Sequence, residues 1–177
     1  TLQIMFRTLD DGCMTIHKML QSNIVPATAE IMDRTCLDAV ARHRKLDFAP
    51  AIGASVVIEI DGEDDKALEV QAKRIEEVAK GCGAIEFRIA QSEQETDELW
   101  AIRRGLSAAV AALAPNRVGE DISVPRDSLP EVVRRIRSIA EKYRFTIAVF
   151  GHAGDGNLHP LILYDANRPG ELERTER

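Results

Sequence analysis

The most constraining feature of the sequence is a glycine-rich segment, Gly151–His159, between two apolar runs at 146–150 and 161–164. Its Asp155-Gly156 pair is the favoured centre of a two-residue β-hairpin turn, because both positions of such a turn need positive φ. We therefore predict a hairpin in which the residue pairs 154/157, 153/158 and 152/159 lie opposite each other.

This register makes two of the four histidines, His152 and His159, direct cross-strand neighbours on one face. Their Cβ atoms would lie ~4.5–5.5 Å apart, so the two imidazoles can share one metal ion. The alternative is a glycine-rich hairpin with two incidental histidines. Catalytic metal sites usually take three protein ligands. No third ligand is obvious nearby, since Asp155 stabilises the turn and Asp165 lies beyond the strand.

The rest of the chain alternates strand and helix patterns. A strand–helix–strand unit is well marked between Ala54 and Ala90. Capping boxes at Ser92/Glu95 and Ser128/Glu131 predict the starts of two later helices, the first running through Leu113. The other predicted segments are strands at 2–9, 30–34 and 118–124 and helices at 10–21 and 35–44. This order predicts an α+β fold: a ferredoxin-like antiparallel or mixed sheet with helices packed on one face.

Composition narrows the function classes. The net charge is −6 and basic residues alternate with acidic ones, which argues against a nucleic-acid binder. Three cysteines without CxxC spacing argue against a disulfide framework and favour a reducing, cytoplasmic setting. No apolar run approaches the ~18–20 residues that span a bilayer. The chain opens without Met inside a strand-like pattern and ends in what resembles an unfinished helix from Glu171, so we expect a fragment of a longer protein.

Other candidate residues give weaker signals. Arg103 and Arg104 lie midway along an otherwise apolar helix. Either guanidinium can clamp a carboxylate through two parallel hydrogen bonds, although a solvated helix face is the simpler interpretation. His17 and His43 are interpreted as surface or packing residues, and Ser107 has no visible base that would make it a nucleophile.

Several segments together resemble a known family. The histidine motif with the Pro160–Gly170 segment after it is similar to the C-terminal domain of FAD-linked oxidases. That group contains the glycolate oxidase FAD subunit and the D-lactate and D-2-hydroxyglutarate dehydrogenases. Glu30-Ile31-Met32-Asp33, the helix at 100–103 and Asp121–Pro125 match the family in order and spacing.

The resemblance implies that residues 1–177 are a truncated substrate and cap domain, without the N-terminal FAD-binding domain and the extreme C-terminus. Such an enzyme oxidises a 2-hydroxy acid to a 2-oxo acid by hydride transfer to FAD. His152 and His159 would bind a divalent metal such as Zn²⁺ or Mn²⁺, and Arg103 and Asn157 would bind the substrate. The third ligand and the base are expected beyond residue 177, so the fragment alone should be inactive.

The resemblance also implies an iron–sulfur electron-transfer subunit as partner. Through such subunits, a cytoplasmic enzyme would lie at the periphery of the inner membrane. The alternative function is a non-catalytic ferredoxin-like module that binds a metal or a small carboxylate.

Overall fold

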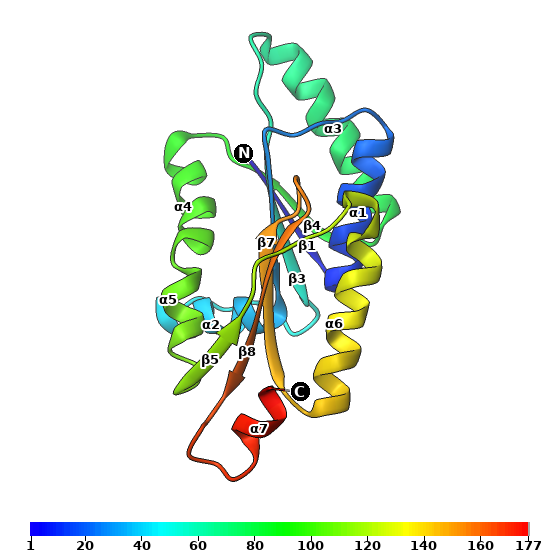
Figure 1. Ribbon diagram of the computed structural model, residues 1–177. Helices are drawn as coiled ribbons and strands as arrows, with labels where there is room; N and C mark the ends of the chain where they lie inside the picture. Colours follow the sequence, from blue (N-terminus) through cyan, green and yellow to red (C-terminus); the bar gives the residue numbers. More distant parts are fainter. Residues whose placement is uncertain (177) are drawn as a thin grey trace.

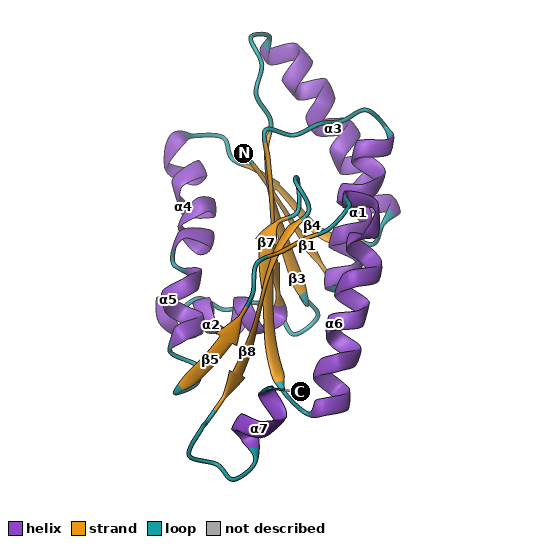
Figure 2. Ribbon diagram, viewed as in Figure 1, coloured by secondary structure: helices purple, strands orange, loops and turns teal. Residues whose placement is uncertain are grey.

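The computed structural model describes residues 1–176 as one antiparallel sheet with helices on both faces (Figures 1 and 2). The strands are β1 (Leu2–Phe6), β2 (Thr28–Asp33), β3 (Ala54–Glu59), β4 (Ala84–Ile89), β5 (Asn116–Gly119), β6 (Ile122–Ser123), β7 (Thr146–His152) and β8 (Asn157–Tyr164). The helices are α1 (Leu9–Gln21), α2 (Arg34–Arg44), α3 (Asp65–Gly81), α4 (Glu93–Arg104), α5 (Leu106–Ala111), α6 (Leu129–Tyr143) and α7 (Glu171–Thr175).

The strands follow the order β4-β1-β3-β2-β7-β8-β5, and β6 also pairs with β8. Each pairing is antiparallel. The predicted α+β class with an antiparallel sheet is therefore confirmed. Strands from the first and last thirds of the chain meet where β2 pairs with β7, and this contact brings Glu30 opposite His152.

Helices cover two faces of the sheet, whereas the sequence led us to expect one. On one face, α1, α3 and α6 pack on alternate strand residues such as Ile4, Ile31 and Val56. On the other face, α2, α4 and α5 pack on Met32, Val57 and other residues of the opposite set. The central strands β1, β2 and β3 are buried at nearly every position because helices cover both of their faces.

Two predicted elements are interrupted. The helix predicted from Ser92 through Leu113 is broken at Gly105 into α4 and α5, consistent with the weak helix propensity of glycine. The strand predicted at 118–124 is divided into β5 and β6, which pair with opposite ends of β8. Glu120 and Asp121 lie in the gap between them, and this break places Asp121 beside His159.

The two predicted capping boxes have different outcomes. Ser92 Oγ accepts a hydrogen bond from Glu95 N at 3.2 Å, so the first helix begins as predicted. The prediction of a capping box at Ser128/Glu131 is wrong. A short 3₁₀ turn, Arg126–Ser128, leads directly into α6, and the Ser128 side chain makes no capping hydrogen bond.

No helix within residues 1–176 combines the length and apolar character that a membrane crossing requires.

Candidate functional site

The predicted hairpin forms, but its register differs from the prediction. β7 and β8 are joined by a turn at 153–156, so His152 pairs with Asn157 and Phe150 pairs with His159. The predicted direct pairing of His152 with His159 is wrong. The turn is longer because the Asp155 carboxylate closes it, accepting a hydrogen bond from Asn157 N at 3.1 Å.

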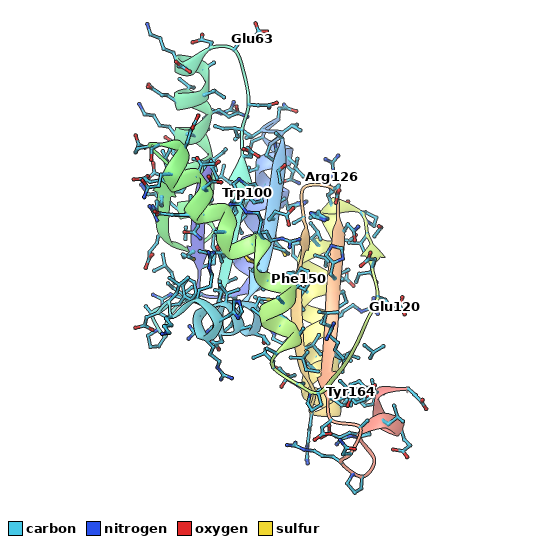
Figure 3. All side chains as sticks on the ribbon, turned by 90° about the vertical axis from the view of Figure 1, so that its left-hand side faces the viewer. Glu63, Trp100, Glu120, Arg126, Phe150 and Tyr164 are labelled. Atoms are coloured by element: carbon cyan, nitrogen blue, oxygen red, sulfur yellow. The ribbon has the colours of Figure 1, made fainter. Side chains whose placement is uncertain are left out.

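The two histidines nevertheless share a face, because they are diagonal neighbours across the hairpin. Their ring centroids lie 5.2 Å apart with the rings nearly perpendicular, at 88°. Phe150 packs beside His159 with a centroid separation of 5.3 Å. Figure 3 views the molecule from the α4–α5 side, with Phe150 behind these helices and Arg126 at the hairpin tip.

Both imidazoles are held by carboxylates through the same ring nitrogen. His152 Nδ1 contacts Glu30 Oε1 on β2, and His159 Nδ1 contacts Asp121 Oδ1 at 2.6 Å. A carboxylate on one ring nitrogen is the usual outer partner of a metal-ligating histidine, because it fixes the ring and leaves the other nitrogen as the ligand. In both rings that other nitrogen is Nε2.

Arg103, near the C-terminal end of α4, joins the same group of side chains. Its Nε donates to Glu30 Oε2 at 2.7 Å, and its guanidinium carbon lies 5.2 Å from the centroid of the Phe150 ring. The Arg103 side chain is 15% exposed and that of Glu30 only 5%. Arg104 instead pairs with the exposed Asp97, so only Arg103 of the two takes part in the site.

Asn157 contributes the fourth predicted side chain. It pairs with His152 on the same face of the sheet. Its Oδ1 atom is buried and has no hydrogen-bond partner within the described residues. A buried polar atom without a partner is unfavourable, so this atom is suited to a ligand that donates a hydrogen bond. The structure thus brings together Arg103, His152, Asn157 and His159, the four residues predicted from the sequence.

Glu30 and Asp121 were not predicted as site residues. Glu30 had a recognisable signal in the sequence, because it is a carboxylate directly between the apolar residues Ala29 and Ile31. Asp121 had none, because its role depends on the break between β5 and β6. Within the described residues, His17, Ser107 and Asp165 make no hydrogen bond or ion pair with the residues of this site.

The comparisons with known proteins identify the family. The family described as "FAD linked oxidases, C-terminal domain" matches residues 1–177. The chain belongs to this family. It is 34% identical to the glycolate oxidase subunit GlcD of Bacillus subtilis over its whole length, covering 37% of that relative. It is 32% identical to the GlcD subunit of Escherichia coli K12, over 97% of the chain and 34% of the relative.

A D-lactate dehydrogenase of Anaerostipes hadrus is 26% identical over 98% of the chain and 38% of the relative. The FAD-linked oxidase chain therefore spans little more than a third of the length of these relatives. Among solved structures, p-cresol methylhydroxylase with bound substrate superposes with a TM-score of 0.61 at 13% identity, covering 99% of this chain and 40% of that one. Alkyldihydroxyacetonephosphate synthase has a TM-score of 0.60 at 12% identity, and the match covers 99% of this chain and 38% of that one. These structures share the fold.

Within residues 1–176, no three or more His, Cys, Asp or Glu side chains form a group that could hold a metal ion. The site offers two imidazole ligands, and a complete metal site needs at least one further donor.

Proposed function

We propose that this chain is the substrate-binding and cap domain of a flavin-dependent 2-hydroxyacid dehydrogenase. Such an enzyme oxidises a 2-hydroxy acid to a 2-oxo acid, and the α-hydrogen leaves as hydride. The observation that carries the proposal is the cluster in which Glu30 joins Arg103 to His152, with His159 and the unpartnered Asn157 oxygen next to His152.

The residues match the chemical unit that the substrates of the named relatives share. Glycolate and D-lactate each carry a hydroxyl and a carboxylate on adjacent carbons. The Nε atom of Arg103 is occupied by Glu30, which leaves the two Nη groups of the guanidinium fork to bind a carboxylate. Asn157 Oδ1 can accept the hydrogen bond of the substrate hydroxyl.

The histidine pair fits a divalent metal as a partial ligand set. His152 and His159 each have Nδ1 held by a carboxylate, so each can present Nε2 to an ion such as Zn²⁺ or Mn²⁺. When bound, the ion supplies Lewis-acid polarisation of the substrate oxygens. We place the third ligand, and the base that takes the hydroxyl proton, outside residues 1–177, in agreement with the family resemblance.

The exposure of the site agrees with the role of a cap. The His152 side chain is 45% exposed while Arg103 and Glu30 are largely buried, so the cluster opens to solvent on the side of His152. A second surface can cover it there and exclude water. When bound, FAD supplies the acceptor for the hydride; we propose that residues outside this chain hold it.

A partner subunit belongs to the same proposal. Two relatives are named as subunits of glycolate oxidase, and an iron–sulfur subunit would carry electrons away from the flavin.

The test uses the intact protein that contains this chain. We expect it to purify yellow with FAD and to reduce a dye with glycolate or D-lactate. Propane-1,2-diol, which has the lactate hydroxyl but no carboxylate, is the matched control and should give no reduction. A colourless intact protein that reduces no dye would contradict the proposal and favour the non-catalytic binding module. Equal reduction with propane-1,2-diol would exclude the role of Arg103.

A further inference from the structure

Glu30 is the one charged side chain among the buried polar residues within positions 1–176. It lies on β2, whose other buried residues are apolar. A buried carboxylate is unfavourable unless it is fully paired, and apolar residues of similar size usually give equal or greater stability. The fold alone therefore gives no reason for a carboxylate at this position.

Both oxygens of Glu30 are used, and each contacts a different element. Oε2 accepts from Arg103 Nε on α4 at 2.7 Å, and Oε1 contacts His152 Nδ1 on β7. Residue 30 is separated in sequence by 73 residues from Arg103 and by 122 from His152. One carboxylate thus fixes the two side chains to which the proposed function assigns the substrate carboxylate and the metal.

The contact with His152 determines which ring nitrogen carries the proton. A carboxylate only accepts hydrogen bonds, so Nδ1 must donate. In the neutral imidazole the lone pair is then on Nε2, the nitrogen that a metal ion or a substrate hydroxyl needs. The contact with Arg103 acts in a parallel way, because it engages Nε and leaves both Nη groups for an incoming anion.

We propose that Glu30 is the positioning residue of this site: it holds His152 in the tautomer with a free Nε2 and orients the Arg103 guanidinium. This inference rests on the proposed function, whose metal and substrate roles it deepens. Glu30 itself touches neither substrate nor metal.

Glu30→Gln separates this role from a purely structural one. Glutamine has nearly the same shape, and its amide oxygen can still accept from Arg103 Nε. Its NH₂ group then faces His152 Nδ1 and donates to it, which moves the ring proton to Nε2 and blocks the ligand nitrogen. A packing role would tolerate this substitution, whereas the positioning role would not.

The experiment measures Zn²⁺ affinity of the metal-free intact protein by competition with a chelating dye. We expect His152→Ala to abolish tight binding and Glu30→Gln to weaken it about 10–100-fold. Asp38→Asn is the matched control: it removes the carboxylate from another arginine Nε contact, Arg34–Asp38 at 2.8 Å, and should leave Zn²⁺ affinity unchanged. Wild-type affinity in Glu30→Gln, or Zn²⁺ binding that His152→Ala does not weaken, would overturn the proposal.

A second measurement needs no folded Glu30 variant. In metal-free wild type labelled with ¹⁵N-histidine, the ring signals of His152, assigned by their loss in His152→Ala, should show a protonated Nδ1 and an unprotonated Nε2. The opposite tautomer would overturn the proposal. If both measurements agree with it but no 2-hydroxy acid reduces the flavin, the proposed function fails and the positioning role stands.

Discussion

The carboxyl group of Asp33 should make the free energy of unfolding of this fold depend on pH. Asp33 is the N-cap of α2; its carboxylate accepts from Cys36 N and from Val149 N of β7, each at 2.9 Å. Burial raises the pKa of Asp33 from 3.8 to about 6, although these two hydrogen bonds oppose the shift. Between these two pH values the folded chain binds more protons than the unfolded chain, so the free energy of unfolding falls as the pH rises. A pKa difference of about 2 corresponds to at most about 3 kcal/mol, and solvent near this partly buried side chain reduces that figure.

The assay is urea unfolding at several pH values between 4 and 7, followed by far-UV circular dichroism. We expect Asp33→Asn to remove this fall in stability, so that the difference between the variant and wild type changes with pH by about 2–3 kcal/mol. Asp64→Asn is the control, since Asp64 is an exposed N-cap that accepts from Lys66 N at 2.9 Å. The reasoning would be refuted if the free energies of unfolding of Asp33→Asn and wild type differed by the same amount at every pH in this range. It would also be refuted if that difference changed no more with pH than the difference between Asp64→Asn and wild type.

Two further predictions concern the hairpin and the thiols. Gly156 has φ +84°, and an added Cβ would lie 2.1 Å from Val124 O, so Gly156→Ala should lower the free energy of unfolding by about 2–4 kcal/mol in urea titrations; a change below the error of the titration would contradict this. Burial raises the pKa of Cys13 to about 12 and that of Cys36 well above its usual range, so a disulfide reagent at pH 8 should react rapidly with Cys82 alone, as peptide mapping would show. Rapid labelling of either buried thiol would count against the packing described.

Local signals predicted much of the fold. The strand–helix–strand unit at 54–90 forms as β3, α3 and β4 within a few residues of the predicted limits, because each element has a clear hydrophobic period and acidic residues precede the helix. The second layer of helices was not foreseen. Burial on two faces removes the alternation of a half-exposed strand, and an apolar strand does not show how many helices cover it.

The candidate site was predicted less completely than the fold. The hairpin residues lie close together in sequence, so His152 and His159 were correctly assigned to one face even with the wrong register. The register error arose because Asp155-Gly156 fits a two-residue turn, whereas the Asp155 side chain stabilises a longer one. Glu30 and Asp121 reach the histidines only through strand pairing across the sheet, which sequence periodicity does not encode.

We propose that Arg103 binds the carboxylate of a 2-hydroxy acid, and this role is the most direct point at which to test the proposed function. The most direct measurement is the rate of flavin reduction by increasing 2-hydroxy acid in the intact protein, comparing wild type with Arg103→Lys. Lysine keeps the charge beside Glu30 but lacks the two-pronged fork, so the apparent substrate Kd should rise about 100-fold. Arg104→Lys, at the exposed pair with Asp97, should match wild type. Flavin reduction by Arg103→Lys at the wild-type Kd and rate would contradict the claim.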